Sequence, residues 1–370
     1  LDKPNIILCM TDDQGWGDTG YNGHPALRTP HLDQMAAEGL QFNRFYAAAP
    51  VCSPTRGSCL TGRHPYRYGI FFANVGHLPA EEFCLADVLK QQGYTTGHFG
   101  KWHLGTLTCD IEDGRRGGRP EQNEHYAPPW ERFFDQCFST EVAVPTCNPM
   151  QDAPFPSKYW TGPGAYATDN LDGDDSRVIM DRALPFIESA AHSETPFFAV
   201  IWFHAPHSPV VAERQHRRIY ADQDEEKQHY YGCITAMDEQ MGRLRQTLRD
   251  LDIAGNTLIC FNSDNGPAGR GGGCDQNPGA RQQGTPGPFR GRKGSLYEGG
   301  IRVPGLMVWP ARIKNHRQVD AACCSSDYFT TILDILGYQL PEEKERPYDG
   351  ISLLPLISGS MCTRPRPIGF

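Results

Sequence analysis

The chain has 370 residues, of which 39% are hydrophobic and 21% charged, and its formal net charge at pH 7 is -9. These values are typical of a globular protein large enough for one α/β core or two domains, and the acidic balance argues against a nucleic acid as partner. No run of about 18 apolar residues occurs, so the sequence predicts no membrane-spanning helix.

Apolar runs and amphipathic stretches alternate along the chain, as in a parallel sheet flanked by helices. In chain order, helices are predicted over residues 29–38, from near 54, and over 85–92, 176–190, 228–251 and 327–336. Buried strands are predicted over residues 5–10, 94–99, 196–203 and 257–261. The carboxyl ends of parallel strands share one edge of a sheet, where ligands gather. The polar residues after these strands are therefore the first candidates for a functional site.

Two predicted strand ends carry side chains with oxygen ligands. Asp12 and Asp13 follow the first strand, and Asp264 and Asn265 follow the strand at 257–261. Carboxylate and amide oxygens suit calcium or magnesium better than zinc. Each pair is by itself also an ordinary turn composition. The sequence predicts a divalent-cation site if the two ends converge.

One segment has a long pattern at fixed spacing. Residues 52–63 read Cys-Ser-Pro-Thr-Arg-Gly-Ser-Cys-Leu-Thr-Gly-Arg. This resembles the signature of the type I sulfatases, Cys-x-Pro-Ser-Arg followed three residues later by Leu-Thr-Gly-Arg, with Thr55 replacing the serine. Residues 100–105, 204–209 and 291–300 resemble further elements of the same family, in the same order.

The resemblance extends from residue 5 to about 356 and implies the alkaline-phosphatase-like fold, a large, mostly parallel sheet flanked by helices. It implies a catalytic domain over residues 1–340. Residues 341–370 would begin a small C-terminal subdomain that is reduced or truncated in this chain.

The resemblance also implies the chemistry of a sulfatase. In the family, a maturation enzyme oxidises the signature cysteine to formylglycine, whose hydrated diol attacks sulfur. The implied catalytic residues are Cys52, Arg56, Lys101, His103, His207 and Lys293. The implied ligands of calcium, with magnesium as the alternative, are Asp12, Asp13, Cys52, Asp264 and Asn265. The residue before Ser-Pro aligns best with the family's catalytic histidine, which favours His207 over His204.

The predicted substrate is a sulfated carbohydrate. Predicted substrate contacts are Arg292 and Trp102, and His204 is predicted either to contact substrate or to lie behind the residues that do. The rings of Trp130, Tyr159 and Trp160 could also stack on a sugar. The arginines of residues 115–119 and 281–292 are expected to attract a polyanion. The alternatives are an arylsulfatase of broad specificity and a non-catalytic protein that binds sulfated glycans with Cys52 unconverted. A two-metal phosphatase or phosphodiesterase is disfavoured, because Asn265 stands where that class uses a histidine.

The chain contains 13 cysteines, which is high for a cytosolic protein and favours a secreted, periplasmic or other extracytoplasmic location. The start without methionine is consistent with a removed signal peptide or with trimming. Cys109, Cys137 and Cys147 are candidates for disulfides, as are Cys323 and Cys324. A zinc site is the rival interpretation of the first group, but its two-residue knuckle spacing is missing. Residues 107–175 lack periodicity and are expected to form the rim of the pocket.

Overall fold

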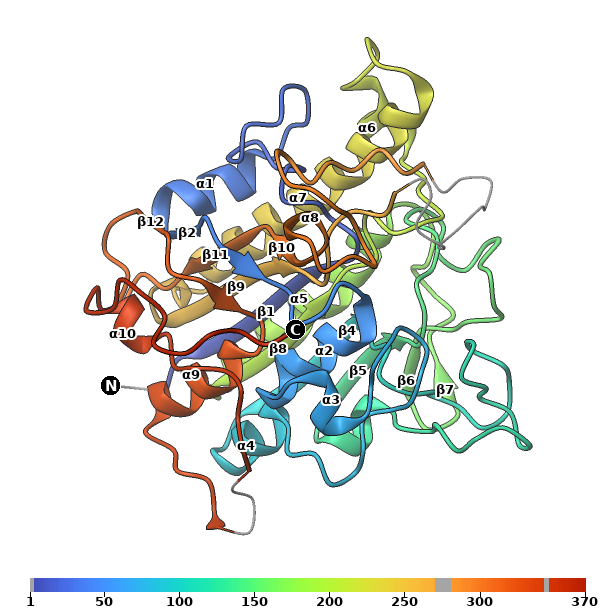
Figure 1. Ribbon diagram of the computed structural model, residues 1–370. Coiled ribbons are helices and arrows are strands. Elements are labelled where there is room, and N and C mark those ends of the chain that lie inside the picture. The colour runs from blue at the N-terminus through green and yellow to red at the C-terminus, as the bar shows by residue number, and fades with distance from the viewer. Residues whose placement is uncertain (1–2, 270–280, 343–345) are drawn as a thin grey trace.

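The computed structural model describes residues 3–269, 281–342 and 346–370 (Figure 1). Within these ranges a ten-stranded sheet crosses the protein. Its strands, in spatial order, are β12 (Arg317–Val319), β2 (Leu40–Phe42), β11 (Gly305–Val308), β9 (Thr257–Ser263), β1 (Asn5–Thr11), β8 (Phe197–Trp202), β4 (Thr95–Lys101), β5 (Gln136–Thr140), β6 (Trp160–Gly162) and β7 (Ala165–Tyr166). A smaller sheet joins β10 (Arg302–Val303), β3 (Phe45–Tyr46) and β13 (Cys323–Cys324).

The centre of the large sheet is parallel. Strand β1 pairs in parallel with β8 and β9, and β4 pairs in parallel with β8 and β5. Antiparallel neighbours appear only outside this centre, where β11 pairs with β9 and β6 pairs with β5. The predicted large, mostly parallel sheet is therefore confirmed, and the four predicted strands all belong to its parallel part.

Helices cover both faces of the sheet, because successive residues of a buried strand point to opposite sides. From β1, Ile6, Leu8 and Met10 enter one apolar core, and Ile7 and Cys9 enter the other. The first core includes residues of α2 (Cys52–Thr61), α4 (Leu85–Gln91), α9 (Asp327–Leu336) and α10 (Leu354–Ile357). The second includes residues of α1 (Pro30–Glu38), α5 (Asp175–His192) and α7 (Glu225–Asp250) (Figure 1). Short helical segments complete the described chain: α3 (Pro65–Tyr68), η1 (Pro129–Arg132), α6 (Arg214–Arg218), η2 (Ala254–Asn256) and α8 (Glu298–Ile301).

The aromatic rings predicted to stack on a sugar lie mainly inside the protein. Trp102 and Tyr159 are 0% exposed and Trp160 is 4% exposed. Trp102 donates through Nε1 to the carbonyl oxygen of Ala127 at 2.8 Å and stacks on Trp202. These rings are core side chains, so the prediction that Trp102 contacts substrate is wrong. Large aromatic rings bury much apolar area, which explains their place here.

The predicted disulfides are not found among the described cysteines, which are free thiols. Cys323 and Cys324 form β13 and are buried, and Cys137 is buried in β5. These side chains pack as small apolar groups, a common role of cysteine in a core. Cys274 lies outside the described residues.

Residues 346–370 pack on the same core as the sheet. The Asp349 carboxylate accepts from the backbone N–H of His64 and pairs with Arg67, and Leu356 is 2% exposed. The division of the chain at residue 340 stays a prediction. No described helix has the length and apolar character needed to cross a membrane.

Candidate active site

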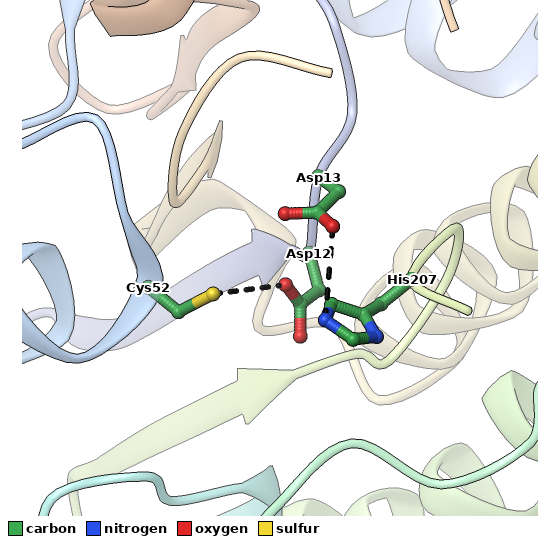
Figure 2. A group of neighbouring side chains, drawn as sticks. All are labelled: Asp12, Asp13, Cys52 and His207. Atoms are coloured by element: carbon green, nitrogen blue, oxygen red, sulfur yellow. Dashed lines mark hydrogen bonds and ion pairs between the residues drawn. The ribbon is translucent and has the colours of Figure 1, made fainter. Parts of the chain in front are cut away.

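The predicted catalytic residues and metal ligands meet at the carboxyl edge of the parallel strands. Strands β1 and β9 are followed by acidic residues, β4 ends in Lys101, and the loop after β8 brings in His207. Helix α2 begins at Cys52 on the same edge. Figure 2 shows Asp12, Asp13, Cys52 and His207 turned toward one another. Their ligand atoms all lie within 4.8 Å of one another.

The acidic cluster has the donor set of a site for a hard cation. Asp264 accepts a hydrogen bond from the backbone N–H of Asp13 at 3.2 Å. Asn265 donates through Nδ2 to Asp13 at 2.7 Å, while its own Oδ1 is buried without a hydrogen-bond partner. A buried amide oxygen without a donor, beside the carboxylates of Asp12, Asp13 and Asp264, fits calcium or magnesium. The Cys52 sulfur is a soft ligand and fits such an ion less well than an oxygen at that position.

Three buried cations balance the carboxylates. Lys101 Nζ lies 2.6 Å from Asp12, Arg56 Nη2 lies 2.6 Å from Asp264, and Lys293 Nζ lies 2.6 Å from Asp13. Burial would raise the pKa of Asp12, but the charge of Lys101 and its neighbours holds it well below its usual value. Burial raises the pKa of Asp264 to about 7, and the nearby charge of Asp12 adds to the rise. The site therefore concentrates opposite charges where water is excluded, and each charge there acts more strongly than at the surface.

The histidine after β4 is held in one orientation. His103 Nε2 lies 2.8 Å from the side-chain oxygen of Asn74, so Nε2 carries the proton and Nδ1 keeps its lone pair. This Nδ1 is buried without a partner. Burial, followed by the charge of Lys101, holds the pKa of His103 well below its usual value. A neutral imidazole with a free nitrogen is suited to accept a proton. Nothing in the sequence pattern marked Asn74 as its partner.

The two histidines after β8 have different surroundings. His204 is 0% exposed, and its ring nitrogens bond to Asp175 at 2.7 Å and Thr140 at 2.8 Å. It therefore lies behind the cavity, which agrees with the second of the two roles predicted for it and not with a direct substrate contact. His207 donates through Nδ1 to the carbonyl oxygen of Ser208 at 2.7 Å, and its Nε2 lies 3.7 Å from Asp13. Burial lowers the pKa of His207. The structure thus places His207, and not His204, beside the acidic cluster.

A buried ion pair braces the loops around the site. Arg116 pairs with Glu141, and it donates to Ser53 Oγ at 2.9 Å, to the carbonyl oxygen of His103 at 3.2 Å and to that of Gly76 at 2.6 Å. Arg116 is 4% exposed, so the prediction that it attracts a polyanion is wrong. Burial raises the pKa of Glu141 to about 7, and the charge of Arg116 opposes the rise. The sequence marked Arg116 only as one of several loop cations.

Arg292 also has a structural role. It donates to the carbonyl oxygen of Ala268 at 3.1 Å and to that of Gly284 at 2.7 Å. Because both bonds tie together the loop that leads to Lys293, and because Arg292 does not line the cavity, its predicted substrate contact is not supported. Burial would lower the pKa of Lys293, but Asp13 and the other nearby negative groups raise it well above its usual value.

A cavity of about 420 Å³ opens over these groups. Its polar lining includes Cys52, Asn74, Lys101, His103, Arg115, His207, Ser208 and Lys293, and its apolar lining includes Val51, Phe72, Ala73, Val142, Ala143, Pro154 and Phe155. Trp102, His204 and Arg292 do not line it. A larger cavity of about 850 Å³ lies beside α3 and residues 366–370, away from the cluster. The smaller cavity is therefore the candidate active site.

Comparison with known proteins agrees with this geometry. A sequence profile described as Sulfatase matches residues 4–338. The chain is 34% identical over 387 residues to N-acetylgalactosamine-6-sulfatase of Sus scrofa, covering 98% of this chain and 67% of that protein. It is 32% identical over 426 residues to steryl-sulfatase of Rattus norvegicus, covering 96% of this chain and 70% of that protein. The crystal structure of Ps i-CgsB in complex with k-i-k-neocarrahexaose is similar, with a TM-score of 0.82, 25% identity, and coverage of 97% of this chain and 77% of that one.

Proposed function

The chain belongs to the sulfatase family and is a sulfuric ester hydrolase, and from this premise we propose that it cleaves a sulfate ester of a carbohydrate with a formylglycine made from Cys52 and a bound calcium ion. The observation that carries the proposal is the convergence of Cys52, the acidic cluster and three buried cations at one cavity. The carbohydrate part is supported by similarity to an N-acetylgalactosamine-6-sulfatase and to a structure that holds a neocarrahexaose.

The metal and the modified residue have defined places in the proposal. Asp12, Asp13, Asp264 and Asn265 would hold calcium, which would supply positive charge beside the sulfate oxygens. A formylglycine at position 52, made by a separate maturation enzyme, would supply an oxygen nucleophile and an oxygen ligand in place of the soft sulfur.

The remaining work falls to the side chains that the structure places around residue 52. Lys101 and Lys293 line the cavity with their ammonium groups beside Asp12 and Asp13, and α2 begins at Cys52 with no side chain capping its first turn, so that its N-terminal end favours an anion. Fixed donors of this kind stabilise charge that develops on sulfate oxygens, since they need no reorganisation. Arg56 donates to Asp264, which follows β9, and to the carbonyl oxygen of Lys101 at the end of β4. It thereby holds these two strand ends in place around the site.

Two histidines are placed to move protons on either side of residue 52. The Nδ1–H of His207 is bonded to the Ser208 carbonyl oxygen, so the doubly protonated ring is the form that can give a proton from Nε2, which faces the cluster, to the leaving oxygen of the substrate. His103 Nδ1 has no hydrogen-bond partner and can accept a proton from the group on residue 52. The bond from His103 Nε2 to Asn74 keeps Nδ1 available.

The test combines the state of residue 52 with turnover. Peptide mass spectrometry on protein produced with and without a maturation enzyme measures conversion of Cys52, and Cys52→Ala serves as the inactive control. A panel of sulfated mono- and oligosaccharides and an aryl sulfate measures activity, before and after exhaustive chelation. We expect turnover to follow both conversion and calcium.

Each alternative has its own outcome. Full activity with unmodified Cys52 would contradict the formylglycine mechanism, and full activity without metal would contradict the calcium site. Turnover of aryl sulfates alone would favour the broad arylsulfatase. Binding of sulfated glycans without turnover, with Cys52 left unconverted although the maturation enzyme is supplied, would favour the non-catalytic alternative. The proposed extracytoplasmic location is tested separately by cell fractionation.

A further inference from the structure

One cation of the cavity has no acidic partner among the described residues. Arg115 lines the same cavity as Cys52, Lys101 and Lys293 and is exposed. Lys101 and Lys293 are paired with Asp12 and Asp13, whereas Arg115 makes no hydrogen bond or ion pair within the described ranges. No aspartate or glutamate is among the lining residues. A guanidinium in such a wall has its donors available to an anion that enters the cavity.

The other cations of the two arginine-rich loops are already engaged. Arg119 pairs with Glu112, Arg281 pairs with Glu226, Arg290 lies over the ring of Tyr297, and Arg292 donates to carbonyl oxygens. Arg116 is committed to Glu141 and to the loops around it. The free charge of Arg115 is therefore not a general property of these loops.

The backbone of Arg115 is held close to the catalytic residues. It lies in a tight turn in which the N–H of Gly117 donates to the carbonyl oxygen of Gly114 at 3.3 Å. The next residue, Arg116, is buried and donates to Ser53 beside Cys52 and to the carbonyl oxygen of His103. Because its neighbour is anchored in this way, Arg115 has a defined place relative to residue 52, and little backbone order has to be gained on binding.

The rest of the wall sets the kind of ligand. Phe72, Val142 and Phe155 give the cavity an apolar side, and Phe72 is 51% exposed. Apolar and aromatic walls accept the C–H faces of a sugar ring, and a cavity of about 420 Å³ has room for more than the sulfate group. A ligand that spans from Lys101 and Lys293 to Arg115 would meet positive charge at both ends.

We propose that Arg115 forms a second anion subsite, so that the preferred substrate carries a carboxylate or a second sulfate beside the sugar whose sulfate is cleaved. This rests on the proposed carbohydrate sulfatase function. Both groups carry at least two terminal oxygens on one atom, carbon in the planar carboxylate and sulfur in the tetrahedral sulfate, and a guanidinium can bind two such oxygens with two parallel N–H donors. Arg115 acts on selection and affinity, and it takes no part in bond cleavage.

The experiment compares matched substrates on the converted, calcium-loaded enzyme. One is a 4-nitrophenyl glycoside of N-acetylgalactosamine 6-sulfate, with a single anionic group, and the other is the same sulfated sugar linked to a uronic acid. For Arg115→Gln we expect kcat/KM to fall about tenfold for the dianionic substrate, mainly through KM, and less than about twofold for the monoanionic one. Arg119→Gln, which removes an exposed arginine paired with Glu112 outside the cavity, is the control and is expected to change neither value.

Further arms separate this proposal from the function on which it rests. A substrate in which a second sulfated sugar replaces the uronic acid tests whether Arg115 binds a sulfate as well as a carboxylate. A pair of aryl sulfates, one with an added carboxylate, tests the subsite even if no saccharide is cleaved, so failure of the carbohydrate proposal is visible by itself. The Arg115→Gln deficit is expected to shrink at high salt. Equal losses on matched mono- and dianionic substrates, or no loss on any dianion, would overturn the subsite.

Discussion

Removing Arg116 is expected to lower both stability and activity, and a matched double variant is expected to restore the stability alone. Arg116→Met deletes a buried charge and leaves Glu141, Ser53 Oγ and the carbonyl oxygens of His103 and Gly76 without their donor. Breaking one side of a buried ion pair costs about 3–5 kcal/mol, since the remaining charge stays in a poorly solvated place. For a chain of 370 residues, about 2 °C per kcal/mol gives a fall in melting temperature of roughly 5–10 °C.

The stability lost in Arg116→Met should depend on pH in a defined direction. Burial raises the pKa of Glu141 to about 7 with Arg116 present, and removing that cation raises it further. A carboxyl whose folded pKa lies above its unfolded value of about 4.3 costs stability as pH rises between the two values. The deficit of Arg116→Met relative to the wild-type protein is therefore expected to be smaller at pH 5 than at pH 8.

The matched control is the double variant Arg116→Met/Glu141→Leu, which removes both charges. It should regain at least half of the lost stability, because replacing both members of a buried pair by apolar groups is often close to neutral. Activity should stay low, because the bonds to Ser53 and to the His103 carbonyl are still missing. Thermal unfolding at two pH values and turnover of one sulfate ester measure both effects. A single variant that melts within about 1 °C of wild type, or a double variant with full activity, would refute this role.

Asn74→Ala should lower kcat by about 10- to 100-fold with little change in KM, because the His103 ring loses the bond that fixes its tautomer; unchanged kcat would show that the bond is dispensable. Cys52→Ser, which offers one hydroxyl, should trap a covalent sulfate adduct visible by mass spectrometry and turn over orders of magnitude more slowly; wild-type turnover would exclude the diol mechanism. Burial lowers the pKa of His229 to about 4, and its Nδ1 accepts from the backbone N–H of Ala212 at 3.0 Å. Its contribution to stability is present above pH ~6.5 and is lost as pH falls toward 4, so His229→Asn should flatten the change in melting temperature between pH 7 and pH 5, and an unchanged slope would contradict this assignment.

Much of the fold and of the site was predictable because it depends on local patterns. The apolar runs that became β1, β4, β8 and β9 are buried on both faces, so their sequences show uninterrupted hydrophobicity. A parallel sheet places the residues after such strands at one edge, which is why Asp12 and Asp264 could be expected together although they lie far apart in the chain. The spacing of residues 52–63 gave the family, and the family gave the roles proposed for Cys52 and Lys293.

Other properties depended on packing between distant segments, which leaves no periodic signal. Trp102 and His204 stand in motifs near the site, but the sequence does not say which side of the backbone faces the cavity, and both point into the interior. Arg115 and Arg116 are adjacent and chemically identical, yet Arg116 is buried against Glu141 and Arg115 is exposed at the cavity. Local sequence determines which groups are available at the edge of the sheet. Whether a given charge braces the protein or meets a ligand is decided by the partner that tertiary contacts bring to it, because an ion pair can satisfy a buried charge only where folding places its counterpart.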